Sequence, residues 1–595
     1  MDIKHTEWNL SLLYNSDDDI NMAKDREAIT KVNSDFIAKW KNRSDYLTNP
    51  SILKEALDEF ENIIRNYGTS GKEGFYFSLR YAQNENDAKI KAKENLIDDF
   101  SLKLDNETQF FLLNLAKIKE TDKFLCAPEL KEYRHFLEKS FESAKYLLSD
   151  PEEKILNLKS GASYSNWVRM TTSLLAKEER YAIDENKKKK LRNFTELTAL
   201  LDSQNKKVRD NAAANVNDIF NKLTDIAEAE LNSVLEDKKT DDELRGLERP
   251  DKSRHIGDDI DTQTVDKLIA AVTSAYNISA RYYLLKTKLL KQKKLGYHER
   301  NVIIGSIEKK YPFKKSVELV YSVFDGLDRE FGNIFRDFID NGQIYAFPKK
   351  GKAGGAFCAS RRLTLPTYIL LNHTGRLHDV LTIAHEAGHG INNELAKIQN
   401  ALNYGTPIST AEVASTFMED FVLQRLLKDA SDEEKLSILM IKLNEDIATI
   451  FRQVACYTFE QELHKNFREN GYLSKIEIGN LFKKHMAGYL GKYVDTKNCE
   501  NWWIHWSHIR HYFYNYSYAS GLLISKALQA KVKKDKSYIK NVKRFLAAGT
   551  SKSPKEIFLE LGIDISDEAF WIEGLNEVNQ LILETEALAK KLGKA

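Results

Sequence analysis

Most of the chain carries apolar residues at spacings of three and four, separated by lysine, glutamate and aspartate. The pattern is clearest in residues 52–67, 265–290 and 433–467, which include ILKEALDEFENIIRNY and VDKLIAAVTSAYNISARYYLLKTKLL. Apolar residues at these intervals form one face of an α-helix. Only nine prolines and 27 glycines occur in 595 residues, so few breaks interrupt these segments. The pattern therefore predicts a predominantly α-helical protein with long helices.

One region departs from the helical pattern. Residues 342–376 hold a cluster of glycines, two prolines and two short runs of β-forming residues, GAFCAS and TYILLN. Such runs between turn residues are typical of short strands, so we expect a small sheet here. An exposed strand edge could bind an extended peptide through main-chain hydrogen bonds. A sheet that only braces the following helix explains the pattern equally well.

A basic run, ENKKKKLRN at 185–193, interrupts the first third of the chain. Consecutive lysines are typical of a solvated helix face or a connector rather than a nucleic-acid site. The run marks a boundary between an N-terminal helical region, residues 1–195, and a second region, residues 196–595. We expect the second region to carry the chemistry.

The overall charge argues against two classes of partner. The chain has 89 basic and 88 acidic side chains, whereas nucleic-acid and membrane-surface proteins usually have a clear positive excess. No uncharged apolar stretch reaches the length of a membrane span, and the N-terminus has no apolar signal core. The four cysteines lie far apart and form no CxxC pair, which argues against a disulfide framework. We expect a cytoplasmic protein; the oligomeric state is left open.

The segment TIAHEAGHGIN, at 382–392, contains an HExxH motif. His385 and His389 share one face of a helix whose first turn Asp379 can cap, because side chains at i and i+4 are neighbours. This separation lets two imidazoles bind one zinc ion. Glu386 is rotated by about 100° from His385, so it stands beside the metal and can take a proton from an attacking water. The alternative is an ordinary helix with two histidines on one side.

Two glycines within this helix need a physical reason. Gly388 and Gly390 each cost a helix interior about 1 kcal/mol relative to alanine. A neighbouring segment or a substrate that approaches the backbone closely would supply the reason.

A catalytic zinc ion needs a third protein ligand and an open position for water. The next amphipathic segment, ISTAEVASTFMEDFVLQRLL at 408–427, offers Glu412. The same glutamate also completes an S-x-x-E capping box with Ser409, and spacing alone does not separate the two interpretations. Glu419, two turns further along, could accept an N–H from a zinc-bound histidine or simply be exposed.

A second unusual stretch is NWWIHWSHIRHYFYNYSYASGLLIS, at 501–525. Its tyrosines alternate at period two, which taken alone predicts a strand, and an aromatic core segment is the simple explanation. Phenol and imidazole donors could instead stabilise the oxyanion that forms when a peptide carbonyl is attacked.

The two segments together resemble the oligoendopeptidase F branch of the thimet oligopeptidase-like zinc peptidases. The family pattern is HExGH followed by E-[VI]-A-S-T-x-x-E, and this chain has HEAGH followed by EVASTFME. The resemblance implies one zinc ion per chain, with His385, His389 and Glu412 as its ligands. It also implies that Glu386 is the general base. Glu419 would not bind the zinc ion itself but would accept a hydrogen bond from a zinc-bound histidine.

The resemblance extends over most of the chain. EWNLSLLY near the start, GGAFCASRRLTLPTYILLN before the histidines and FLAAGTSKSPKEIFLELGIDI near the end are similar to segments of that branch. The strand segment implies that Gly354, Gly355, Ala356 and Phe357 bind substrate. Asn392 stands where many relatives have a further histidine that is not a ligand. Two arginines in ASRRLTLP replace residues that are often small, which leaves substrate preference near this strand open.

The tyrosine-rich stretch resembles the family element H-F-Y-x-x-F-Y-x-Y-x-Y-A-T-G, with His508 and Gly521 at its ends. In the family this element is helical, against the strand expectation, and faces the zinc across a cleft. The implied oxyanion donors and substrate binders are His508 and a tyrosine among Tyr514, Tyr516 and Tyr518. We expect His505 and His511 to be structural.

The resemblance thus implies a two-lobed helical body around a deep channel, and we expect it to hydrolyse internal bonds of short unfolded oligopeptides with zinc. A zinc exopeptidase is one alternative. A peptide-binding scaffold without activity is another, although the intact HExxH motif argues against it.

Overall fold

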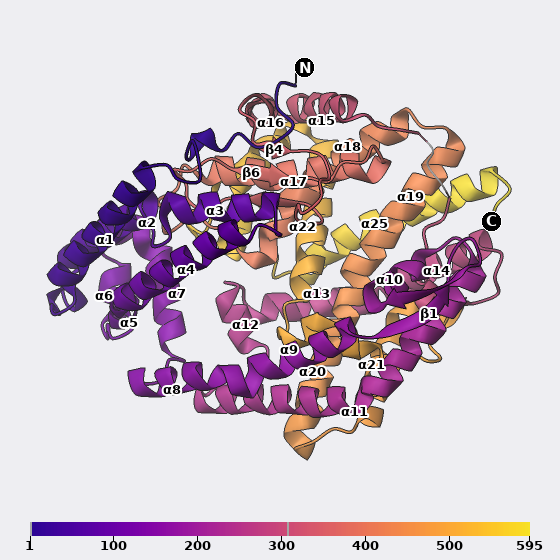
Figure 1. Cartoon of the computed structure of the whole chain (residues 1–595), viewed down its shortest axis with the longest axis horizontal. Helices are drawn as coiled ribbons and strands as arrows, with labels where there is room; N and C mark the ends of the chain where they lie inside the picture. Colours follow the sequence, from indigo (N-terminus) through magenta and orange to yellow (C-terminus); the bar gives the residue numbers. More distant parts are fainter. Residues whose placement is uncertain (1–2, 306–308) are drawn as a thin grey trace. The chain divides into compact units, whose positions relative to one another are not determined.

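The computed structural model describes residues 3–305 and 309–595 and is predominantly helical (Figure 1). The described chain divides into two compact units, each assembled from three separate stretches of sequence. Unit 1 comprises residues 1–145, 307–428 and 528–563, and unit 2 comprises residues 146–306, 429–527 and 564–595. The expected functional division at residue 195 stays a prediction.

Unit 1 contains an N-terminal group of helices, a small sheet with the helices around it, and two helices from the C-terminal part. The helices are α1 (Asn21–Trp40), α2 (Pro50–Asn66), α3 (Gly71–Gln83), α4 (Ala88–Thr108), α5 (Phe110–Leu115), α6 (Thr121–Leu125), α7 (Arg134–Ala144), α15 (Phe313–Leu327), α16 (Arg329–Asp340), α17 (Leu377–Ala396), α18 (Ala411–Lys428), α23 (Ile539–Ala547) and α24 (Pro554–Glu560). The strands are β4 (Ile344–Tyr345), β5 (Phe357–Ala359) and β6 (Tyr368–Leu370).

Unit 2 is built around α11 (Lys206–Leu244), a helix of 39 residues. Its other helices are α8 (Asp150–Ser160), α9 (Asn166–Ala176), α10 (Phe194–Ala199), α12 (Lys252–Gly257), α13 (Thr262–Ser274), α14 (Tyr276–Leu289), α19 (Asp432–Ile447), α20 (Gln453–Asn470), α21 (Lys475–Leu490) and α25 (Glu568–Lys591). The strands are β1 (Glu179–Ile183), β2 (Lys189–Asn193), β3 (Leu295–Gly296) and β7 (Val494–Asp495). One of the boundaries between the units falls within α22 (Tyr516–Lys534).

The expected small sheet before the histidines is confirmed. Its strand order is β4-β6-β5, with β4 parallel and β5 antiparallel to β6. In the register, Phe357 pairs with Leu370 and Ala359 pairs with Tyr368. Because β5 is the last strand of the order, its outer edge has no strand partner among the described residues.

The N-terminal segment braces this sheet from within unit 1. The Trp8 indole N–H donates to the Ile369 carbonyl over 2.9 Å, and the Trp8 ring packs against Tyr345 and Tyr368 with centroids 5.6 and 5.7 Å apart. These side chains are all nearly buried. The tryptophan of the EWNLSLLY segment therefore contributes directly to the core that holds β6 in place.

Helices α17 and α18 pack closely side by side (Figure 1). At Gly388 on α17, an added Cβ would lie 2.8 Å from both the Ala414 carbonyl oxygen and the Ser415 Cα of α18. At Gly390, it would lie 2.7 Å from the Phe338 ring. The two glycines therefore allow the close approach that their presence in a helix suggested.

The helical pattern over 265–290 is confirmed as α13 and α14, which are separated at Ala275 by a φ of −97° and a ψ of 16°. Two other expectations from the sequence need correction. The basic run at 185–193 is neither a helix face nor a plain connector, because it forms the turn and second strand of the antiparallel β1–β2 hairpin. The alternating tyrosines form no strand among the described residues; Tyr512 and Tyr514 lie in the turn before α22, and Tyr516 and Tyr518 lie in its first turn.

The helix expected over 433–467 is present as α19 and α20, joined by a π-helical turn at Ala448–Arg452. A π-helical turn inserts one residue and rotates the faces of the helix that follows. Among the described residues, no helix combines the length and apolar composition needed to cross a bilayer.

Candidate functional site

Helix α17 presents the HExxH residues to a cavity of unit 1. Asp379 accepts the backbone N–H groups of Thr374 and Arg376 at 2.7 and 2.9 Å, which fixes the start of the helix. His385 and His389 then stand one turn apart, with ring centroids separated by 5.1 Å. Glu386 is only 7% exposed.

Glu412 at the start of α18 completes a cluster with the two histidines. Its Oε2 lies 3.4 Å from His385 Nε2 and 3.6 Å from His389 Nε2. Two donors bound tetrahedrally to one zinc ion lie roughly 3.3–3.5 Å apart. The donor types of His385, His389 and Glu412, and their distances from one another of less than 4.8 Å, therefore suit a zinc ion.

The capping-box alternative for Glu412 is not what the structure shows. Ser409 lies in a short 3₁₀ turn before α18, and its buried hydroxyl has no hydrogen-bond partner among the described residues. The Glu412 carboxylate instead approaches the histidines and accepts the Ser415 hydroxyl at 2.9 Å. The observed contacts therefore argue against the capping box and favour a position of Glu412 beside the histidines, two interpretations that sequence spacing did not separate.

Glu419 lies two turns further along α18 and contacts the outer nitrogen of His385. The distance from His385 Nδ1 to Glu419 Oε2 is 3.1 Å. A carboxylate here favours a proton on Nδ1, so that Nε2 keeps its lone pair toward the cluster. Glu419 is therefore placed to orient His385 and to raise its basicity.

Burial and neighbouring charges shift the pKa values of the cluster residues in opposite directions. Burial lowers the pKa of His389 to about 4. Burial would also lower the pKa of His385, but hydrogen bonds to Glu412 and Glu419 override it and raise that pKa to about 10. Against its burial, the same histidines lower the pKa of Glu412 to about 2, which keeps it an anion. Without a metal, His385 therefore holds a proton between the two carboxylates, and a bound cation would take the place of that proton.

The pKa of Glu386 is shifted in the opposite direction from that of Glu412. Burial raises its pKa to about 7, and the negative charge of Glu412 acts in the same direction, against the His385 charge and a backbone hydrogen bond at Cys358. A carboxyl group with a pKa near neutrality can both accept and return a proton.

The cavity beside these residues has a volume of about 650 Å³. Ala356 and Phe357 of the β5 segment line it together with His385, Glu386, His389 and Glu412. Gly355 and Ala356 line an adjoining cavity of about 210 Å³. Gly355 has a φ of +71°, and no atom lies within 4 Å of a Cβ added at Gly354 or Gly355. The edge of β5 is thus open beside the cluster.

The predicted residues of the tyrosine-rich stretch lie in unit 2, and only some of them meet. The His508 ring stacks on Tyr514 with centroids 5.0 Å apart, and the Tyr518 hydroxyl lies 3.4 Å from the Tyr514 hydroxyl. Tyr516 is fully buried and donates to Asp258 at 2.7 Å. His508, Tyr514 and Tyr518 therefore form a group that Tyr516 does not join.

His508 retains unused hydrogen-bonding capacity. Burial lowers its pKa to about 4, with Arg452 and His511 acting in the same direction, so the ring is neutral at physiological pH. Its buried Nδ1 has no partner among the described residues. His505 is partly buried and stacks on Phe220, in keeping with a structural role.

The turn before α22 is strained, and sequence analysis did not find the residue that holds it. Tyr512 and Phe513 have φ values of 52° and 57°, a left-handed conformation that costs bulky residues about 1–3 kcal/mol each. The buried Glu460 of α20 accepts the Phe513 backbone N–H at 2.8 Å and the Asn515 amide at 2.7 Å. No signal in a single sequence distinguishes this glutamate from the exposed ones on an amphipathic helix.

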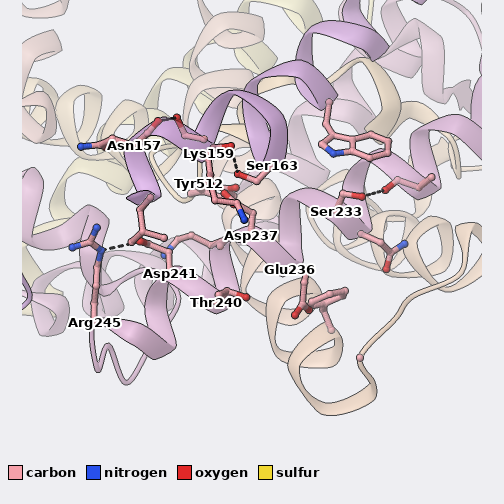
Figure 2. A pocket seen from close by; sticks show the side chains of 18 of the residues that line it. Asn157, Lys159, Ser163, Ser233, Glu236, Asp237, Thr240, Asp241, Arg245 and Tyr512 are labelled. Carbon is pink, nitrogen blue, oxygen red and sulfur yellow. Dashed lines mark hydrogen bonds and ion pairs between the residues drawn. The ribbon is translucent and has the colours of Figure 1, made fainter. Parts of the chain in front are cut away.

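Unit 2 has a cavity of its own, of about 1150 Å³ (Figure 2). Figure 2 shows side chains of α8 and the turn after it, including Lys159 and Ser163, opposite Ser233, Glu236 and Asp237 of α11. The charges on this wall are largely paired, for example Arg245 with Asp241 over 2.9 Å. Nothing in the cavity wall selects one class of ligand.

A second cluster of ligand-type residues does not have the character of a metal site. Donor atoms of Asp210, His298 and Glu299 lie within 4.8 Å of one another. Lys206 and Arg209, however, already pair with these carboxylates, at 2.7 and 2.6 Å. The negative charge that would attract a cation is therefore neutralised.

Comparison with known proteins gives matches over nearly the whole chain. Residues 166–577 match the family model of Peptidase family M3, and residues 113–177 match that of Oligopeptidase F. An oligoendopeptidase F homolog of Borreliella burgdorferi is 24% identical over 95% of this chain and 95% of its own.

Solved structures share the fold. A protein of Chlamydophila abortus aligns with a TM-score of 0.86 at 22% identity, covering 98% of each chain. The oligoendopeptidase-F of Enterococcus faecium aligns with a TM-score of 0.68 at 17% identity, covering 96% of this chain and 99% of its own.

Proposed function

This chain belongs to peptidase family M3, and on that premise we propose that it is a zinc-dependent endopeptidase of short, unfolded oligopeptides. The observation that carries the proposal is the cluster in unit 1. Nε2 atoms of His385 and His389 stand 3.4 and 3.6 Å from one carboxylate oxygen of Glu412, with Glu386 directly beside them in the chain. These are the parts that metal-assisted peptide hydrolysis needs.

In this proposal His385, His389 and Glu412 hold one zinc ion per chain. The bound ion supplies Lewis acidity, which polarises a peptide carbonyl and eases deprotonation of water. Glu419 fixes the His385 tautomer through Nδ1. The donor set of two imidazoles and a carboxylate fits zinc well, although affinity alone does not select it over other divalent ions.

Glu386 acts as the general base and then as the general acid. Its carboxylate takes a proton from the attacking water and delivers it to the departing amine. Burial, which raises its pKa to about 7, makes it a stronger base than an exposed glutamate. The same burial excludes bulk water that would compete for the proton.

The remaining predicted roles concern the substrate. The open edge of β5, together with residues 354–357 at and before its start, is proposed to pair with an extended peptide through backbone hydrogen bonds. His508 with Tyr514 or Tyr518 is proposed to donate to the developing oxyanion. The buried bond from Tyr516 to Asp258 makes Tyr516 the least suitable of the three tyrosines.

The proposed location is the cytoplasm. The four cysteines are free thiols, which supports a reducing compartment.

The test is digestion of a short, internally quenched peptide with both ends blocked, with products sized by mass spectrometry. We expect internal cleavage that stops on chelation and returns with zinc. Glu386→Gln should bind zinc and fold normally, yet lose turnover by roughly 10²–10⁴-fold, because it cannot accept a proton. Cleavage of only unblocked peptides would instead indicate an exopeptidase, and normal turnover by the variant would refute the mechanism.

A further inference from the structure

The cavity beside the metal cluster has one strongly basic side chain on its wall. Among the described residues that line it, Arg361 is the only lysine or arginine. The adjoining cavity, which shares Ala356 with the first, is lined by no lysine or arginine among its described residues. The two cavities share Ala356, just before β5. A peptide bound along β5 and the segment before it would therefore have Arg361 near one of its ends.

Arg361 is exposed and makes no hydrogen bond or ion pair with another described residue. Arg361 acts on Glu94 of α4, where its charge opposes the rise in the Glu94 pKa that burial causes. Glu94 does not line the cavity. The guanidinium thus keeps its donors for a ligand.

The neighbouring arginine shows the contrast. Arg362 is largely buried, where burial lowers its pKa to about 10, and it is influenced by Tyr14 and Asp25 rather than by the cavity. A structural arginine and a cavity arginine are therefore adjacent in the chain. Beside Arg361, the Ser360 and Tyr404 hydroxyls lie 2.6 Å apart on the same wall, which adds neutral donors.

We propose that Arg361 is a specificity-determining residue that selects peptides presenting a carboxylate at this end of the cavity. The inference rests on the proposed peptidase function. A guanidinium binds a carboxylate through two parallel N–H···O bonds, which a neutral amide cannot match. An aspartate or glutamate side chain and a free chain terminus supply the same group.

The test compares blocked peptides that differ only in carrying glutamate, glutamine or lysine at each position in turn. We expect kcat/KM to favour glutamate at one position by roughly three- to tenfold, since a partly exposed ion pair is screened by solvent. The ratio should fall toward one in Arg361→Gln, be partly kept in Arg361→Lys, and shift toward lysine-containing peptides in Arg361→Glu. The control is Arg329→Gln, an exposed arginine of α16 outside both cavities, which should keep the ratio.

Two further arms separate the possible outcomes. A glutamine peptide with a free or an amidated C-terminus tells whether the carboxylate comes from the chain end. Binding of the same peptides to Glu386→Gln, followed by fluorescence anisotropy, measures selectivity without turnover. Carboxylate-selective binding without any cleavage would sink the proposed function and keep this inference; cleavage and binding with equal ratios in wild type and Arg361→Gln would overturn the inference alone.

Discussion

At the scale of single residues, the candidate metal centre depends on which atom of each side chain meets its partner. Glu419 contacts Nδ1 of His385, which leaves Nε2 for the cluster with Glu412. Glu412 and Glu419 lie on the same helix but make different contacts. Glu412 approaches Nε2 of both histidines, whereas Glu419 contacts only Nδ1 of His385. Substitutions at the two positions should therefore differ in kind.

Glu419→Gln should weaken zinc binding by roughly 10–100-fold, because the amide keeps the shape of the side chain but loses the charge that raises the basicity of His385. Glu412→Gln should weaken it more, since a ligand is lost. Competition against a chromophoric chelator measures both. Equal affinities for wild type and Glu419→Gln would show that Glu419 does not support the site.

Much of this site is predictable from the sequence. The remainder is not predictable, because it depends on how helices pack in the folded protein. The separation of His385 and His389 follows from helix geometry alone. The choice for Glu412 between a capping box and the cluster depends on where α17 lies relative to α18, which no local pattern contains. Glu460 stays hidden for the same reason, because its role comes from tertiary burial. The sequence points to the arginine pair in ASRRLTLP but not to which of the two lines a cavity.

At the scale of elements, the site depends on the contact between α17 and α18, since each helix carries part of the cluster. Gly388 sets their distance of approach, because backbone atoms of α18 lie 2.8 Å from where its Cβ would be. Backbone atoms cannot rotate away as a side chain can. The sequence predicted a close neighbour at this glycine but not which segment it would be.

Gly388→Ala should push the helices apart, lower the free energy of unfolding by about 1–3 kcal/mol and weaken zinc binding. The matched control is Gly326→Ala within α15, where nothing lies within 4 Å of the added Cβ. That change should stabilise the protein by roughly 0.5–1 kcal/mol, the usual gain for alanine in a helix. Chemical denaturation and chelator competition test the pair; an unaffected Gly388→Ala would mean that the contact is loose.

A second element-scale prediction concerns α20 and the strained turn that it supports. Burial raises the pKa of Glu460 from 4.5 to about 8 in the folded protein. Because the folded state holds the proton more tightly, this carboxyl group contributes its full stability below about pH 4.5 and loses it as the pH rises toward 8.

Glu460→Gln cannot ionise, so its stability should fall less between pH 5 and pH 8 than that of the wild type, by roughly 2–4 kcal/mol. Urea unfolding at the two pH values, followed by tryptophan fluorescence, measures the difference. Identical pH dependence in both proteins would contradict the burial of a carboxyl group at this position.

At the scale of the whole molecule, sequence order and structural units do not coincide. Each unit draws on three stretches of the chain, whereas the candidate metal cluster of unit 1 lies within residues 307–428 and the His508 group of unit 2 lies within residues 429–527. No single boundary along the chain separates the residues of the two units. All three candidate ligands nevertheless belong to unit 1.

Metal removal should therefore be felt mainly within unit 1. Hydrogen exchange with and without chelator should show lower protection in peptides from α17 and α18, while peptides from α11 and α20 change little, because a ligand stabilises the part that binds it. Loss of protection confined to unit 2 would place the metal elsewhere.

The most direct test of the central claim is a titration of zinc into the chelated protein, with cleavage of the end-blocked peptide measured at each addition. The account predicts that activity rises in proportion to zinc and stops rising at one equivalent per chain, with no rise in a His389→Ala variant. Full activity before zinc is added, or restored activity in that variant, would contradict it.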